Sequence, residues 1–271
     1  MTEYNCLNVT NCDGVITVRI SREEQRNSLS LELMRELTDF ALAHRDDNET
    51  HAIILRGADT FFSAGADLSI FEEKNAKASA GEKRPKLMEL RKEANVGPNM
   101  CKAWEELPCV TITAIEGHCI GGAAALAVAC DFRIMGESAY MSLPEVPLGI
   151  NMSWHTVPRL VAMIGPSRTK RMVMFGEKLK ANQLETWGCA DEVVPDGTTH
   201  DTAQTWAANL SKLPPLPIRM TKHAVNAATA ANNYAATYME SDQYLLTALS
   251  EDFEEGVSAF LEKRMPDFKG N

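Results

Sequence analysis

Short β-branched segments alternate with helical segments through the first half of the chain, and this order constrains the fold more than any other feature. Residues 15–20 alternate polar and apolar side chains, which is typical of a half-buried strand. Residues 28–43 carry apolar side chains at helical spacing after a serine. Further strands are predicted at 52–57, 110–115 and 131–135. A helix is predicted at 86–106, with a break at Gly97–Pro98, and another helix is predicted to begin after Gly121.

Beyond residue 153 the pattern is helical almost to the end, apart from a short strand predicted at 192–194. Strands interleaved with helices, followed by helices alone, indicate an α/β fold with a helical C-terminal region. We therefore expect residues 1–200 to form the α/β core and residues 201–271 to form a separate helical region.

The charge and the cysteines exclude several classes of function. A formal net charge of −10 over 271 residues argues against nucleic acid or an anionic membrane surface as a partner. The seven cysteines are scattered without a CxxC pair, so neither a disulfide framework nor a zinc site is indicated. No apolar run is long enough to span a bilayer, and the polar N-terminus lacks a signal-peptide pattern, so a cytoplasmic location is expected.

Two loops that follow predicted strands are rich in small residues. The first is 62–68 (FSAGADL) and the second is 117–124 (GHCIGGAA). Small residues at such turns let a ligand approach the main chain closely, and a helix that opens in the second loop would point free N–H groups outward. Two N–H groups aimed at one carbonyl oxygen would stabilise an enolate. For either loop by itself, glycines that permit tight packing are the better explanation.

Taken together, the motifs resemble those of the enoyl-CoA hydratase/isomerase (crotonase) superfamily over roughly residues 8–269. The first loop resembles the first oxyanion-hole motif of that family, and residues 117–134 resemble the second. Pro144–Glu145 and Gly149 follow at the family's usual distance. The segments at 26–30, 165–168 and 256–264 are also similar.

The resemblance implies a spiral of ββα units with a helical C-terminal trimerisation region, assembled as a homotrimer or a dimer of trimers. It implies that Ala66 and Gly122 donate the two oxyanion N–H groups and that the substrate is an acyl-CoA thioester. Coenzyme A arrives with the substrate, so no separate cofactor and no metal are expected. The residues expected to contact the CoA are Arg26, Asn27, Ser28, Ala64, Asp67 and Leu68, with Tyr244 and Lys263 of a neighbouring subunit.

The chain departs from the hydratases of this family at one position. Family hydratases place a water with two glutamates, and here the second is present as Glu145 whereas the first falls on Ala125. Alanine can neither hold a water nor donate a proton. A single carboxylate suits Δ3,Δ2-enoyl-CoA isomerisation, in which one base removes a proton and returns it elsewhere. Hydration of a 2-enoyl-CoA is the main alternative function. Hydrolysis or decarboxylation of an acyl-CoA, and a non-catalytic role in binding CoA, rank below it.

The segment after Gly149 offers further candidates. Met152 and Trp154 are expected either to line an acyl pocket or to pack at a helix start. His118 and His155 are alternative acids, and Asn151 is a residue that could order a water.

Overall fold

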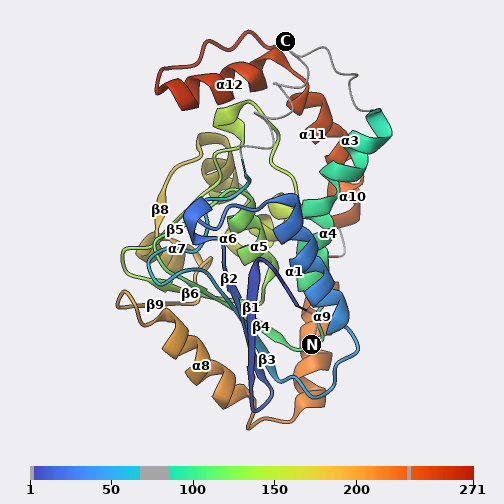
Figure 1. Cartoon of the computed structure of the whole chain (residues 1–271), viewed down its shortest axis with the longest axis vertical. Helices are drawn as coiled ribbons and strands as arrows, with labels where there is room; N and C mark the ends of the chain where they lie inside the picture. The colour runs from blue at the N-terminus through green and yellow to red at the C-terminus, as the bar shows by residue number, and fades with distance from the viewer. Residues whose placement is uncertain (1–2, 68–85, 231–232) are drawn as a thin grey trace.

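The computed structural model describes residues 3–67, 86–230 and 233–271 (Figure 1). The described strands are β1 (Leu7–Cys12), β2 (Val15–Ile20), β3 (Ala52–Arg56), β4 (Val110–Ile115), β5 (His118–Ile120), β6 (Phe132–Gly136), β7 (Tyr140–Ser142), β8 (Leu179–Lys180) and β9 (Glu192–Val194). The described helices are η1 (Glu23–Gln25), α1 (Leu31–Ala43), α3 (Leu87–Ala94), α4 (Val96–Glu105), α5 (Gly122–Ala129), η2 (Val146–Leu148), α6 (Thr156–Phe175), α7 (Ala181–Trp187), α8 (Thr199–Leu210), α9 (Pro215–Ala230), α10 (Asn233–Thr237), α11 (Glu240–Ala248) and α12 (Glu251–Glu262).

The strands form two sheets. The larger has the order β1-β2-β3-β4-β6-β9 and is parallel except for the β1–β2 pair. The smaller has the order β5-β7-β8. Two units, β4-β5-α5 and β6-β7-α6, each place their first strand in the large sheet and their second in the small one. This repeated ββα path carries the chain from turn to turn of a spiral.

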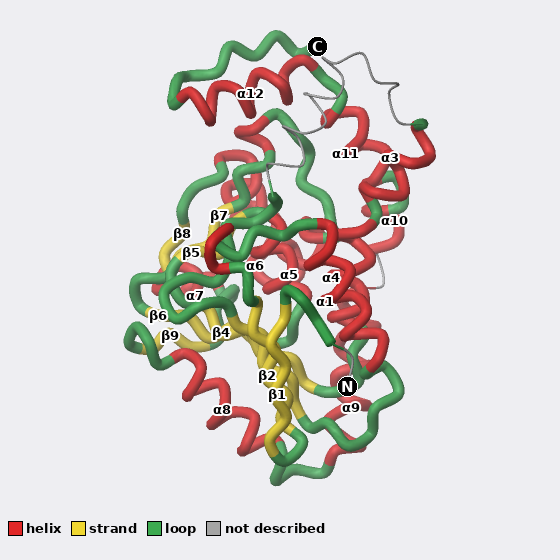
Figure 2. Tube along the Cα trace, in the orientation of Figure 1, coloured by secondary structure: helices red, strands yellow, loops and turns green. Residues whose placement is uncertain are grey.

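Side chains of β3 and β4 alternate between two hydrophobic cores because successive residues of a strand point to opposite faces. Ile53 and Leu55 pack with α1, α4 and α5 in the larger core, whereas Ile54 packs with α8 in the smaller one. Figure 2 shows the strands between α8 on one side and α1 and α4 on the other. Helix α8 begins next to the expected boundary at residue 200, and its Ala203 and Ala207 are buried against the sheet. A separate helical region after residue 200 stays a prediction.

Most predicted elements are present, with shifted ends. The predicted strands overlap β2, β3, β4, β6 and β9, and the Gly-Gly pair opens α5. The first helix starts later than Ser28 because Ser30 is its N-cap, accepting a hydrogen bond from the Leu33 N–H at 3.2 Å.

The predicted break at Gly97–Pro98 is wrong. The chain breaks at Asn95, between α3 and α4, and Pro98 lies in the first turn of α4. Proline is tolerated there because the N–H groups of a first turn have no partner within the helix.

Helices α11 and α12 lie at the end of the molecule away from α8 (Figure 1), whereas Ile218 of α9 packs against the core formed by β3 and β4. Most of the exposed large hydrophobic side chains among the described residues lie after residue 210. Helix α12, at the end of the molecule opposite α8 in Figure 1, packs on η2. A Cβ on Gly256 would come within 2.4 Å of the Leu148 carbonyl oxygen, so the contact is close. None of the described helices is both long and apolar enough to cross a bilayer.

Candidate active site

The first small-residue loop presents the backbone of Ala66 outward. Leu29 donates its N–H to the Gly65 carbonyl at 2.7 Å and accepts from the Asp67 N–H at 3.3 Å. In a parallel bridge of this kind, the residue between the two bonds, here Ala66, turns its own N–H and C=O away from the partner strand. Ala66 is exposed, and its N–H has no acceptor in the described part of the chain.

The second loop leads into the N-terminus of α5. Gly121 (φ +55°) is the N-cap, and its carbonyl accepts the first helical hydrogen bond, from Ala125 at 3.0 Å. The N–H of Gly122, the first helical residue, therefore precedes the first helical bond and has no acceptor among the described residues. The helix dipole adds partial positive charge at this end.

The two loops run side by side in the same direction. Ser63 and Cys119 form a parallel bridge, through bonds of 3.0 Å to the His118 carbonyl and 3.2 Å from the Ile120 N–H. Ala66 lies three residues after Ser63, and Gly122 lies three residues after Cys119. Gly65 (φ +87°) brings the segments close, because a Cβ there would lie 2.4 Å from the Ile120 carbonyl oxygen.

Glu145 lies next to the second loop, immediately before η2. A Cβ on Gly121 would come within 2.7 Å of the Glu145 Oε1 atom, so only glycine leaves room for this carboxylate. The Oε2 atom is buried and has no hydrogen-bond partner among the described residues, although the residue as a whole is partly exposed. Burial raises the pKa of Glu145 from 4.5 to about 7. An unpaired carboxyl group that titrates near neutrality is suited to moving protons.

Ala125 is fully buried one turn into α5. Its neighbours along the helix are alanine, leucine and valine, all of them buried. The position at which family hydratases have their other glutamate therefore offers no polar side chain in this chain.

Tyr244 of α11 lies near Glu145 of the same chain. Burial raises the pKa of the Tyr244 phenol to about 12, and the negative charges of Glu145 and Glu93 contribute to this rise. The contact of Tyr244 and Lys263 with the CoA of a neighbouring subunit stays a prediction. Lys263 is exposed at the C-terminal end of α12.

Of the residues expected to contact CoA, Arg26 is exposed and Asn27 is fully buried. The Asn27 side chain donates to the Phe62 carbonyl at 3.1 Å and accepts from the Arg22 N–H at 2.9 Å. It therefore fixes the segment at 26–28 against the first loop. The Ala64 N–H donates to the Arg26 carbonyl at 3.0 Å, across the same contact.

Arg22, which the motif analysis missed, organises the rest of that group. It pairs with Asp67 at 3.3 Å, and Asp67 also accepts from the Ser28 hydroxyl at 3.0 Å. Leu68 lies outside the described residues. The contact of Leu68 with CoA stays a prediction, as do the contacts of the other residues expected to bind CoA.

The two alternative acids, His118 and His155, each contact a neighbouring side chain. His118 stacks on Phe61 with ring centroids 5.1 Å apart, and burial lowers its pKa. Burial also lowers the pKa of His155, whose Nε2 is 3.6 Å from Glu240. A neutral imidazole is a weaker proton donor than a carboxylic acid whose pKa is about 7, as that of Glu145 is. Asn151 is held by its main-chain N–H, which donates to the Thr247 hydroxyl at 3.0 Å.

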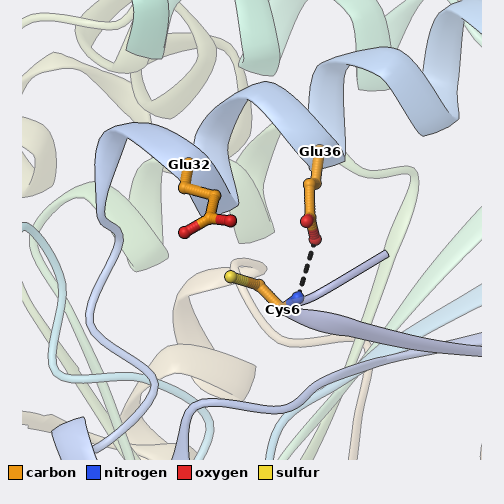
Figure 3. A group of neighbouring side chains, drawn as sticks. All are labelled: Cys6, Glu32 and Glu36. Carbon is orange, nitrogen blue, oxygen red and sulfur yellow. Dashed lines mark hydrogen bonds between the residues drawn. The ribbon is translucent and has the colours of Figure 1, made fainter. Parts of the chain in front are cut away.

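One group of described residues has the spacing of metal ligands, formed by Cys6, Glu32 and Glu36 (Figure 3). Glu36 accepts from the N–H groups of Asn5 and Cys6, each at 2.8 Å, and Glu32 accepts from the Asn5 amide at 2.9 Å. Burial raises the pKa of the Cys6 thiol to about 11. The carboxylates fasten the start of β1 to α1, so the group has a structural explanation.

A cavity of about 640 Å³ lies between α5, α6 and α9, and it is a different place from the site just described. Its lining includes Val128, Arg159, Leu213 and Lys222. Ala66, Gly122 and Glu145 do not line it. The cavity is therefore separate from the free N–H groups and the carboxyl group of the candidate site.

Comparison with known proteins points to one family. The family model described as enoyl-CoA hydratase/isomerase matches residues 10–271. A 2,3-dehydroadipyl-CoA hydratase of Escherichia coli (strain K12) is 31% identical over 94% of this chain and 95% of its own length. A mitochondrial methylglutaconyl-CoA hydratase of Homo sapiens is 32% identical over 95% of this chain and 74% of its own length.

Solved structures confirm the expected fold class. The crystal structure of an enoyl-CoA hydratase from Mycobacterium avium subsp. paratuberculosis K-10 superposes with a TM-score of 0.86 at 25% identity, covering 98% of this chain and all of that one. An enoyl-CoA hydratase from Bacillus anthracis gives a TM-score of 0.75 at 30% identity, with 98% of this chain covered and all of that one. With the family model matching nearly its whole length, this chain belongs to the enoyl-CoA hydratase/isomerase (crotonase) family.

Proposed function

We propose that this protein isomerises enoyl-CoA thioesters by moving one proton with Glu145. The observation that carries the proposal is the Glu145 carboxyl group, which lies against Gly121 in the second loop with its Oε2 atom buried and unpaired among the described residues, while Ala125 stands in place of a second carboxylate. In this proposal the N–H groups of Ala66 and Gly122 bind the thioester oxygen as an oxyanion hole.

The reaction then needs no other titratable group. The Glu145 carboxylate removes a proton from the α carbon of a 3-enoyl thioester, and the electron pair delocalises into a dienolate whose oxygen accepts both N–H groups. Glu145 returns the same proton to the γ carbon, and the double bond ends between the α and β carbons. No atom is gained or lost, and the carboxylate is regenerated.

Hydration of a 2-enoyl-CoA is the second candidate, and the names of the relatives favour it. The relatives in E. coli and H. sapiens are both named as hydratases, and neither name mentions isomerisation. Hydration by this chain would require Glu145, or another group, to position the water without a polar side chain at position 125.

One experiment separates the two reactions. The purified protein is incubated with panels of 3-enoyl-CoA and 2-enoyl-CoA in water enriched in ¹⁸O, and the thioester products are analysed by mass spectrometry. Isomerisation predicts consumption of 3-enoyl-CoA without ¹⁸O in the product. Rapid consumption of 2-enoyl-CoA with one ¹⁸O incorporated would replace our proposal with hydration.

We also propose that the chain forms a homotrimer or a dimer of trimers through its C-terminal helices. The exposed hydrophobic side chains of α9, α11 and α12, such as Met220, Leu246 and Phe260, support this assembly.

A further inference from the structure

The indole of Trp154 lies against the proposed oxyanion hole. A Cβ on Gly122 would come within 2.4 Å of two atoms of the six-membered ring of Trp154. A Cβ on Gly97, at the start of α4, would come within 2.0 Å of the same indole from the other helix. The ring is therefore wedged between the N-terminal turns of α4 and α5, and glycine at both positions is what leaves room for it.

The backbone that carries this ring is strained. Trp154 (φ +65°) and His155 (φ +56°) are consecutive non-glycine residues in the left-handed region. Each costs roughly 1–2 kcal/mol, and such strain persists only where the surroundings impose it. A pair of this kind beside a catalytic loop points to a functional constraint on the position of the ring.

Two buried charged groups impose that conformation. The Arg159 guanidinium donates to the Trp154 carbonyl at 2.8 Å and is held by Glu105 through two bonds of 2.9 and 2.8 Å. The Glu240 carboxylate, only 5% exposed, accepts the His155 N–H with both oxygens, at 2.9 and 3.1 Å. Arg159 and Glu240 thus fix the backbone on both sides of the Trp154–His155 peptide.

We propose that Trp154 is the wall that limits acyl-chain length, and that Glu240 is the positioning residue that holds it there. The inference rests on the proposed binding of an acyl-CoA thioester. A thioester oxygen bound at the Gly122 N–H brings its acyl carbons beside the indole, which closes the space between α4 and α5. The chain therefore accepts short acyl groups and excludes extended ones.

The test measures binding of saturated acyl-CoA thioesters, which cannot isomerise or add water. Dissociation constants for butyryl-CoA and octanoyl-CoA are measured by calorimetry for the wild type, Trp154→Ala and Trp154→Phe. Each methylene group that gains a buried site strengthens binding by about fourfold, so the four extra groups have a ceiling of about 200-fold. We expect Trp154→Ala to shift the octanoyl-to-butyryl affinity ratio at least 10-fold toward octanoyl-CoA, and Trp154→Phe to give a smaller shift in the same direction.

Trp187→Ala is the matched control, since Trp187 is a partly buried tryptophan of α7 that stacks with Arg168 and Arg171. It should leave the affinity ratio unchanged. Glu240→Ala removes the acceptor of the His155 N–H and should shift the ratio toward that of Trp154→Ala. Glu240→Gln retains an acceptor oxygen and should stay close to the wild type.

The outcomes separate this inference from the reaction proposed above. A folded Trp154→Ala or Trp154→Phe protein with an unchanged ratio overturns the role of the wall, even if the enzyme isomerises 3-enoyl-CoA. An unchanged ratio in Glu240→Ala overturns the positioning role. A shifted octanoyl-to-butyryl affinity ratio in a protein that turns over no enoyl-CoA supports the limit that Trp154 sets on acyl-chain length. The same result refutes the proposed isomerase activity. Absence of any acyl-CoA binding refutes both.

Discussion

Replacing Glu145 with glutamine should lower activity and raise stability, and both effects follow from one buried carboxyl group. Glutamine has nearly the same shape but cannot accept the substrate proton. General acid–base groups contribute roughly 10² to 10⁴ to rates, so we expect Glu145→Gln to lower the turnover rate by at least ~100-fold. Affinity for a saturated acyl-CoA should change little, because the N–H groups of Ala66 and Gly122 are main-chain atoms.

The effect on stability depends on pH. The folded protein holds the Glu145 proton up to about pH 7, whereas the unfolded chain releases it near pH 4.5. Because the folded pKa is the higher one, the contribution of Glu145 to stability is fully present below pH 4.5, falls between pH 4.5 and 7, and is lost above pH 7. A difference of one pKa unit corresponds to about 1.4 kcal/mol, so the stabilisation lost between pH 4.5 and 7 is about 3 kcal/mol. Part of the residue contacts solvent, so we expect a loss of about 1 to 3 kcal/mol.

Urea denaturation of the wild type and Glu145→Gln at pH 5 and pH 8 measures this loss. The free energy of unfolding of the wild type minus that of the variant should be lower at pH 8 than at pH 5. Taking the difference removes the contribution of Glu240, whose pKa burial also raises to about 7. Equal differences at the two pH values would show that the carboxyl group is solvated, and a variant of near-normal rate would move the acid/base role to another residue.

The remaining predictions concern the oxyanion hole, the second carboxylate, metals and assembly. Gly122→Pro should abolish turnover in a steady-state assay. Gly122→Ala is its control, because it keeps the N–H while its Cβ displaces the indole of Trp154 as the proline Cβ would. Normal turnover by the proline variant would exclude this donor. Ala125→Glu should introduce or raise hydratase activity, measured by ¹⁸O incorporation, if the buried helix admits the side chain and a water. A folded variant without hydratase activity would contradict the role assigned to Ala125. Chelators should leave activity unchanged, and activity lost on chelation and restored by a divalent cation would contradict an oxyanion hole made of N–H groups alone. Sedimentation should show a particle well above 29.9 kDa, and a species of only that mass would rule out the oligomer.

The sequence predicts the buried parts of the fold better than the supports of the site. The β-branched run in β4 and the Gly-Gly start of α5 carry local signals, and both elements are present. The break before α4 was misplaced because Pro98 is as acceptable in a first helical turn as after a helix end. Local pattern cannot distinguish the two when the preceding helix has no capping glycine.

The positions of Trp154 and Glu145 depend on contacts that no local pattern encodes. Glu240, which holds the Trp154–His155 backbone, lies 85 residues farther along the chain. The space for the indole and for the carboxylate comes from Gly97, Gly121 and Gly122, and in each case the contact is with a residue from a later part of the sequence. Sequence motifs therefore predict which residues belong to the site. The crowding that sets their geometry appears only when the two helix N-termini, the tryptophan and the carboxylate are brought together by the fold.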